Sequence, residues 1–190
     1  MLRENQEKEK IEELGKESFR AMEEIARESN SETVDLIVDH ELNGVTPEML
    51  DWWWDHINNT ERYKLWHPND HISFKWEKSP ENGHVGAIQS VIETVKVPTL
   101  LRIRWEDPNL IPIKATYNHV LAGSVLDIND NSLSWILHEY ESIIDGIKLR
   151  TTFRLPAKTP RWFIKALHKH NIEEISQFIN FLPKLYEENK

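Results

Sequence analysis

Residues 159–187, TPRWFIKALHKHNIEEISQFINFLPKLYE, decide the fold of this chain. Thr159-Pro160 marks the start of a helix, and core-type positions then recur three or four residues apart, as on one helix face. The row consists of Phe163, Leu167, His170, Glu174, Phe178 and Phe181. We therefore predict a long final helix over about residues 160–187, in which Pro183 kinks or ends the last turn.

Two ionisable residues, His170 and Glu174, occupy positions in this row that would normally be apolar. Burying them is costly unless another group partners them. Their spacing of four residues projects both side chains from one face, about one turn apart. A neutral imidazole and a carboxylate in that arrangement suit a metal ion. The row therefore predicts a site inside the fold.

The segments before this helix change to a period of two, mixing β-branched and aromatic residues with polar ones, as strands do. Short turn signals, such as Glu81-Asn82-Gly83, separate them and favour an antiparallel meander. An earlier strand and two short helices complete the series. The expected strands are 34–38, 72–76, 87–97, 101–105, 115–128, 133–144 and 148–155, and the short helices are 49–57 and 61–65. We predict an α+β fold, a curved antiparallel sheet around the final helix.

The N-terminal segment, residues 4–28, is rich in Glu, Lys, Arg and Ala, with apolar residues at helical spacing. We expect a charged amphipathic helix that ends at Ser29-Asn30 and serves in packing or self-association. It is therefore a candidate to mediate a homodimer.

Composition excludes several classes of function. The chain has 190 residues, enough for one domain with a sizeable core, and 23 Lys and Arg against 32 Asp and Glu give a formal net charge of −9. With no basic run interleaved with aromatic residues, we expect no nucleic-acid partner. No stretch approaches about 20 apolar residues, and the N-terminus is charged, so we expect no membrane span or secretory segment and a cytoplasmic protein. Because cysteine is absent, any metal must use His, Asp, Glu or water.

Five of the eight tryptophans lie between positions 52 and 76. A wall of large flat side chains suits an aromatic ligand, although core packing is the alternative for each single tryptophan. The segment His138-Glu139-Tyr140-Glu141 also draws attention. Alternation along a strand sends neighbouring side chains to opposite faces, so these four residues cannot form one clustered site.

The Trp-rich segment and the final helix together resemble the 2,4-diacetylphloroglucinol hydrolase and phloretin hydrolase family. The matching motifs are Asp51-Trp52-Trp53, then Arg62-Tyr63-Lys64-Leu65-Trp66-His67-Pro68-x-Asp70-His71, and His170-x-x-x-Glu174. The resemblance covers about residues 34–187. It implies a helix-grip (Bet v 1/START-like) catalytic domain, so we divide the chain into a charged N-terminal helix, 1–30, and that domain, 31–190.

The resemblance also implies one zinc ion held by two histidines and two glutamates. His170 and Glu174 match the helical pair directly. His71 is preferred over His67, because the family's substrate-contacting tyrosine precedes its ligand by the same spacing as Tyr63 precedes His71. The second glutamate is expected on a following strand, as Glu93, with Glu77 as the alternative. Zinc rests on the resemblance, since iron or manganese accepts the same ligands.

The implied activity is hydrolysis of the carbon–carbon bond between an acyl group and a phloroglucinol-like ring, a retro-Claisen cleavage of a small aromatic ketone. A metal lowers the pKa of bound water toward about 7 and polarises the carbonyl, so no Ser or Cys nucleophile is needed. The predicted acid or base is His119 or Tyr63. The predicted substrate contacts are Tyr63, Trp66 and Tyr140.

Two other functions are compatible with the same sequence. One is a non-enzymatic helix-grip carrier of an aromatic or lipid ligand. The other is a metal-free cyclase or dehydratase that uses His and Tyr as acid and base. A stoichiometric metal would favour the hydrolase, a metal-free and ligand-filled cavity the carrier, and activity insensitive to chelators the cyclase.

Overall fold

The computed structural model describes residues 2–81 and 83–190; Met1, and Asn82 in the turn predicted at 81–83, lie outside the described residues. The elements follow the predicted order. They are α1 (Leu2–Glu28), β1 (Thr33–Asn43), α2 (Pro47–His56), α3 (Thr60–Trp66), β2 (His71–Lys78), β3 (Ile88–Val95), β4 (Val97–Glu106), β5 (His119–Leu126), β6 (Ser132–Ile143), β7 (Gly146–Pro156) and α4 (Arg161–Asn189).

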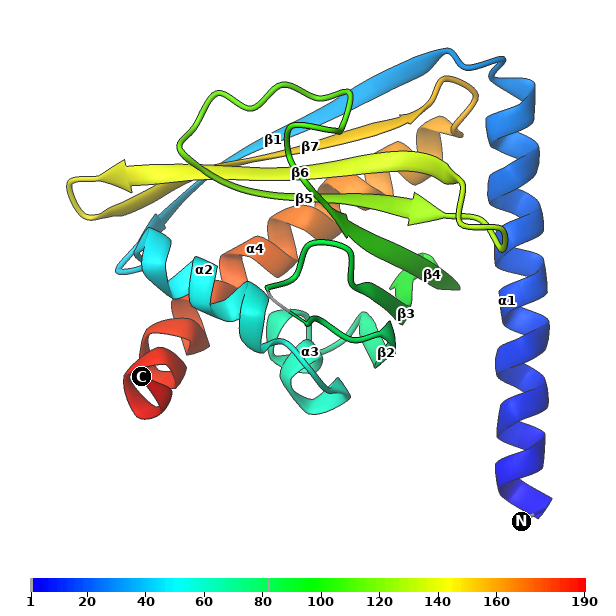
Figure 1. Cartoon of the computed structure of the whole chain (residues 1–190), viewed down its shortest axis with the longest axis horizontal. Coiled ribbons are helices and arrows are strands. Elements are labelled where there is room, and N and C mark those ends of the chain that lie inside the picture. Colours follow the sequence, from blue (N-terminus) through cyan, green and yellow to red (C-terminus); the bar gives the residue numbers. More distant parts are fainter. Residues whose placement is uncertain (1, 82) are drawn as a thin grey trace.

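The seven strands form one antiparallel sheet in the order β1-β7-β6-β5-β4-β3-β2. The first strand pairs with the last over eleven positions, from Thr33 opposite Pro156 to Asn43 opposite Gly146. The sheet curves, and α4 runs along its inner face (Figure 1). The predicted fold class, a curved antiparallel sheet around a long C-terminal helix, is confirmed.

The inward face of α4 carries the residues that the sequence placed there, because the helical period puts them on one side. Leu167, His170, Glu174 and Phe178 are all buried. The helix continues past Pro183 to Asn189, so Pro183 does not end it; the alternative, that Pro183 kinks the helix, stays a prediction. Although proline removes one backbone hydrogen bond, Leu182 beside it is fully buried and anchors this turn in the core.

Each of the two short helices begins at a side-chain cap, Thr46 for α2 and Asn59 for α3. The Thr46 side chain accepts a hydrogen bond from the Met49 backbone N–H, and Pro47 occupies the first turn. These helices bring most of the tryptophan cluster inside. Trp53 and Trp54 are buried in the main core against Phe178, so they pack rather than form an exposed wall.

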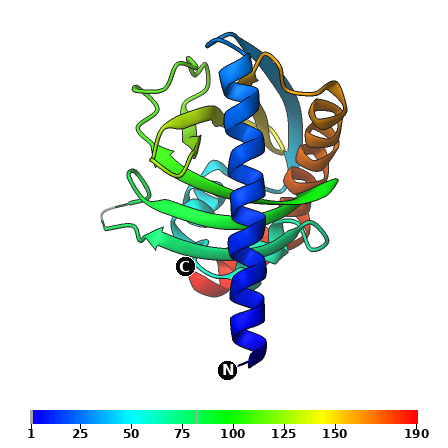
Figure 2. The same ribbon diagram turned by 90° about the vertical axis from the view of Figure 1, so that its right-hand side faces the viewer.

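The N-terminal helix α1 stands at one end of the sheet and crosses its strands (Figure 2). Its main contact is β4, where the Leu100 backbone N–H donates to Ser18 Oγ at 3.0 Å. Met22 packs against the main core. Of the two roles predicted for this helix, packing is observed, and self-association stays a prediction. Within residues 2–81 and 83–190, no helix combines the length and apolar character needed to span a membrane.

Candidate metal centre

Three elements, β2, β3 and α4, bring four ionisable side chains to one place. In the β2–β3 pair, His71 lies directly opposite Glu93 in the strand register. On α4, His170 and Glu174 lie one turn apart on the buried face. The helix passes over the hairpin so that its pair meets the strand pair. The structure thus gathers all four residues that the family resemblance implied as ligands.

The four distances from an imidazole nitrogen to a carboxylate oxygen in this group are nearly equal. His71 Nε2 lies 3.6 Å from Glu174 Oε2 and 3.9 Å from Glu93 Oε1. His170 Nε2 lies 3.8 Å from Glu174 Oε2 and 3.9 Å from Glu93 Oε2. Ligand atoms about 2.0–2.2 Å from a tetrahedral zinc ion lie roughly 3.3–3.6 Å from one another. His71, His170 and Glu174 offer one ligand atom each within 4.8 Å of one another, and Glu93 would have to turn toward them to complete a set of four around one ion.

The ring of His71 fits a metal ligand. Its Nδ1 donates to the Tyr63 carbonyl oxygen at 3.0 Å, which leaves the lone pair on Nε2. That Nε2 is buried and has no hydrogen-bond partner among the described residues. A buried polar atom without a partner is costly, and a metal ion between His71 and the two carboxylates would satisfy it. The donor set and this orphaned nitrogen both fit a divalent metal.

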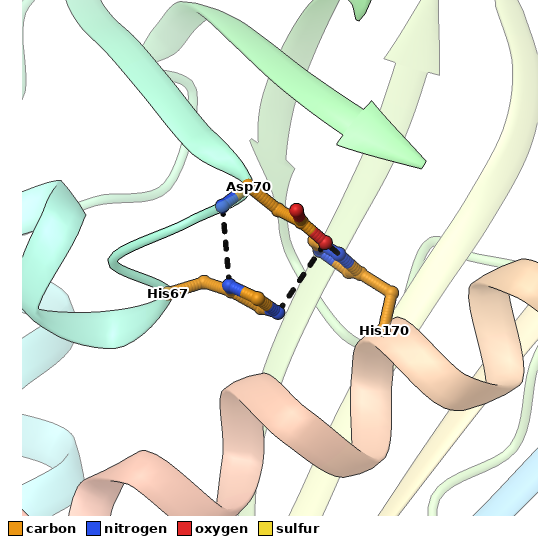
Figure 3. A group of neighbouring side chains, drawn as sticks. All are labelled: His67, Asp70 and His170. Carbon is orange, nitrogen blue, oxygen red and sulfur yellow. Dashed lines mark hydrogen bonds and ion pairs between the residues drawn. The ribbon is translucent and has the colours of Figure 1, made fainter. Parts of the chain in front are cut away.

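The other three side chains also have a second partner that orients them. His170 Nδ1 donates to Asp70 Oδ2 at 3.2 Å (Figure 3). Glu174 Oε1 accepts from Asn171 Nδ2 at 2.8 Å, and the Tyr63 hydroxyl donates to Glu93 Oε1. Such outer contacts fix the tautomer and direction of metal ligands.

His67 and Glu77, the alternative ligands that the sequence left open, have other partners. The ring of His67 stacks on His170, with centroids 4.7 Å apart, and its Nδ1 accepts from the Asp70 backbone N–H (Figure 3). Its Nε2 lies 3.5 Å from Asp70 Oδ2, so it faces Asp70 rather than Glu93. Glu77 forms an ion pair with Arg102 at 2.7 Å. Glu77 is therefore held away from the group, whereas His67 forms a second group with Asp70 and His170 whose ligand atoms lie within 4.8 Å of one another. We keep His71 as the ligand beside Glu93 because its Nε2 faces both carboxylates.

Electrostatics within the group follow from burial and close opposite charges. Burial alone would raise the pKa of Glu174, but contact with His71 and the charge of His170 lower it to about 2. Burial alone would lower the pKa of His170, yet the carboxylates of Glu174, Glu93 and Asp70 raise it above its usual value. Burial and the adjacent Glu93 raise the pKa of Tyr63 well above its usual range. In the absence of a metal, the group is a network of mutually stabilised charges.

The group opens into a cavity of about 480 Å³, a size typical of sites for small organic molecules. Glu93, His170 and Glu174 form part of its wall. Tyr63 and Trp66, both predicted to contact substrate, also line it. The remaining wall is mainly apolar.

Two predicted site residues lie elsewhere. His119 Nδ1 is 2.8 Å from Asp51 Oδ2, and the Tyr140 hydroxyl donates to Asp51 Oδ1 at 2.6 Å. Neither side chain is part of the cavity wall. His119 on β5 lies opposite Tyr140 on β6. Because both side chains contact Asp51 of α2, they connect α2 to the sheet. The structure therefore corrects the placement expected for His119 and Tyr140.

Sequence reasoning missed His138, which lines the cavity from β6. Its Nδ1 lies 2.9 Å from Thr151 Oγ1, and its ring stacks on Trp54. Burial lowers the pKa of His138 to about 4, so the ring is neutral at pH 7. As alternation requires, Glu139 points to the opposite side and binds Thr116. No local signal marks the cavity side of β6, because residues on both of its faces, from Leu137 to Tyr140, are buried.

Comparison with known proteins identifies the family. The model of the DAPG hydrolase PhiG domain matches residues 29–165, more than half of the chain. The chain belongs to this family. The match includes His71 and Glu93 and ends before His170 and Glu174.

A curated relative, phloretin hydrolase from Eubacterium ramulus, is 26% identical over 184 residues. The matched region covers 78% of this chain and 66% of the relative, so the chain spans about two thirds of that protein's length.

Solved structures show the same fold at low identity. The crystal structure of Ara h 8.0201 is 10% identical with a TM-score of 0.55, and the solution structure of KanY is 8% identical with a TM-score of 0.57; each match covers 80% of this chain and 98% of that one. The solution structure of the Aha1 dimer from Colwellia psychrerythraea is 13% identical, with a TM-score of 0.51, over 79% of this chain and 96% of that one. The fold of this chain is the helix-grip fold.

Proposed function

We propose that this protein is a metal-dependent hydrolase that cleaves the carbon–carbon bond between an acyl group and a phloroglucinol-like ring. The observation that carries the proposal is the meeting of two imidazoles and two carboxylates beside a cavity. Each imidazole nitrogen lies 3.6–3.9 Å from an oxygen of both carboxylates. Membership of the DAPG hydrolase family and the similarity to a phloretin hydrolase support the type of reaction. In this proposal residues 31–190 form the catalytic domain and residues 1–30 the helix before it.

His71, Glu93, His170 and Glu174 would hold one metal ion per chain. Two imidazoles and two carboxylates suit zinc, and iron or manganese accepts the same donors. When bound, such an ion supplies a Lewis acid for the substrate carbonyl and lowers the pKa of water toward neutrality. The reaction adds water across the bond: the acyl carbon gains the hydroxyl, the bonding electron pair passes to the ring, and the ring carbon gains a proton.

The chain's own side chains would orient the substrate and stabilise the leaving ring. Trp66 would bind the aromatic ring, and the apolar wall would exclude bulk water. His138, neutral at pH 7, can donate a hydrogen bond to an oxygen of the ring as negative charge develops there. This role replaces the one predicted for His119, which lies outside the cavity wall. Tyr63, whose hydroxyl donates a hydrogen bond to Glu93, would position that carboxylate.

The test combines metal analysis with one matched pair of variants. Protein purified without added metal should contain about one metal ion per chain and release a carboxylic acid from acylphloroglucinols, measured by chromatography. His71→Ala should lose both metal and activity. His67→Ala, which removes the neighbouring ring that faces Asp70, should retain the metal.

Other outcomes would contradict the proposal. A metal-free protein that carries a bound aromatic or lipid ligand would favour the carrier function. Cleavage that survives complete removal of metal by a chelator would favour metal-free acid–base chemistry. If His67→Ala rather than His71→Ala lost the metal, the ligand assignment would be wrong.

A further inference from the structure

The cavity extends well beyond the proposed metal ligands. Along α4, its wall runs from Glu174 back to Trp162, twelve residues of helix or about 18 Å. The ionisable groups of α4 in this wall, His170 and Glu174, lie at one end. At the other end α4 contributes Trp162 and Phe163. The cavity is therefore polar near the proposed metal and apolar far from it.

The helix α1 supplies part of the far wall. Strand β4 pairs with β5 only from Ile103 to Glu106, so within the described residues positions 97–102 have no partner strand on that side. Here Leu100 bonds to Ser18 of α1 instead. The α1 residues that line the cavity are mostly apolar; they include Leu14, Ala21, Met22 and Ile25. The helix thus fills a gap in the sheet and forms one side of the apolar end of the cavity, which is partly open to solvent at Trp162 and Val97.

This wall lies outside the region that identifies the family. The family match begins at residue 29, directly after α1 ends at Glu28. The proposed metal ligands on β2 and β3 lie inside the match. The substrate contacts that α1 can make are therefore an addition of this chain to the matched family region.

We propose that α1, with Trp162 and Phe163, forms a binding subsite for an apolar acyl tail, so that the preferred substrates are phloroglucinol-like ketones with long acyl chains. The inference rests on the proposed function, because the polar end of the cavity is taken to hold the ring and carbonyl. We assign an acyl tail to the apolar end because one continuous cavity joins the proposed metal ligands to the apolar wall. A tail anchored on the carbonyl carbon extends toward α1.

The test uses the whole 190-residue chain, loaded with zinc, and a series of acetyl-, butanoyl-, hexanoyl- and octanoylphloroglucinol. Each methylene that becomes buried should strengthen binding by about fourfold. The same factor should appear in kcat/KM. Dissociation constants are measured by calorimetric titration, and cleavage is measured separately by release of the carboxylic acid.

Two substitutions in α1 should change this dependence on tail length. Ala21→Trp fills the far end of the cavity and should abolish the gain for the hexanoyl and octanoyl compounds. Met22→Ala removes apolar wall and should weaken octanoyl binding roughly fourfold. The matched control is Arg27→Trp, which adds the same ring to α1 at a side chain that is 76% exposed and outside the cavity wall. It should behave as wild type.

Each result decides between the two proposals. Binding that does not depend on tail length, or a dependence unchanged in both Ala21→Trp and Met22→Ala, would overturn the subsite. A normal tail-length dependence in binding, lost in Ala21→Trp, with no carboxylic acid released from any compound, would support the subsite and overturn the hydrolase function.

Discussion

Replacing Glu174 with Gln should destabilise the metal-free protein by an amount that the structure allows us to work out. Contacts with His71 and His170 lower the pKa of this buried carboxyl from 4.5 to about 2. A difference of about 2.5 pKa units, at about 1.4 kcal/mol each, corresponds to roughly 3 kcal/mol of folding free energy at pH 7. Gln cannot ionise and loses this contribution, although it keeps a partner for the Asn171 amide.

The pH dependence has a definite sign. Because the pKa is lower in the folded state than in the unfolded chain, the stabilisation is fully present above about pH 4.5 and is lost as the pH falls toward 2. The difference between wild type and Glu174→Gln should therefore be largest near neutral pH and should shrink below pH 4.5. The assay is urea unfolding of chelator-treated protein, in which roughly 3 kcal/mol moves the midpoint by about 1 M or more.

The neighbouring residue provides a matched control. The Glu173 side chain is 43% exposed, against 7% for Glu174, and pairs with Lys169 across one turn. Such an exposed pair contributes only about 0.3–0.5 kcal/mol, so Glu173→Gln should have little effect. Equal losses in the two variants, or no loss in Glu174→Gln, would refute the electrostatic argument. With metal restored, only Glu174→Gln should fail to bind it stoichiometrically.

Three further predictions concern the groups around the proposed ligands. Asp70→Asn should raise the dissociation constant for zinc about 10- to 100-fold in a chelator competition, because it weakens the partner of His170. Tyr63→Phe should also weaken zinc binding, because the Tyr63 hydroxyl donates a hydrogen bond to Glu93. A raised KM with unchanged metal affinity would instead indicate a direct contact between Tyr63 and the substrate. For His138, burial lowers the pKa from 6.5 to about 4, so between these pH values the unfolded chain takes up a proton that the folded protein does not, and stability falls as the pH falls. In urea unfolding between pH 7 and pH 4, the free energy of unfolding should therefore depend less on pH for His138→Asn than for wild type.

The chain offers close controls for the first two of these. Asp55 contacts a ring nitrogen of His84 at 3.1 Å, as Asp70 contacts His170, but lies outside the proposed site. Asp55→Asn should leave zinc affinity unchanged. Tyr140 is also buried and also donates its hydroxyl to a carboxylate, that of Asp51. If Tyr140→Phe weakened zinc binding as much as Tyr63→Phe does, the effect would reflect loss of packing rather than orientation of Glu93.

The sequence predicted the local elements well because their signals are short-range. Helical spacing identified the buried face of α4, and alternation located all seven strands. Turns were less certain. The strands predicted at 87–97 and 101–105 placed a turn at residues 98–100, but the β3–β4 hairpin turns at Lys96, whose φ is 72°, and Pro98 lies within β4. Proline and polar residues indicate where a turn can form, whereas strand register decides where it does form.

The site was predicted less completely, because it depends on which strand faces meet which helix. Alternation alone could not say that one face of β6 places His138 in the cavity. It also could not say that Asp51 would hold His119 and Tyr140 at a different part of the molecule. Likewise, the charged N-terminal helix was expected, but its position against β4, and so its share of the cavity wall, was not.

By itself, the sequence determined that His170 and Glu174 lie side by side, because a spacing of four residues on a helix fixes their direction whatever else the chain does. It also determined the order of the strands and helices. Only the tertiary structure decided that His71 lies opposite Glu93 and that α4 crosses them within 3.6–3.9 Å. Strand register and helix docking depend on how the whole core packs, and no local pattern carries that information.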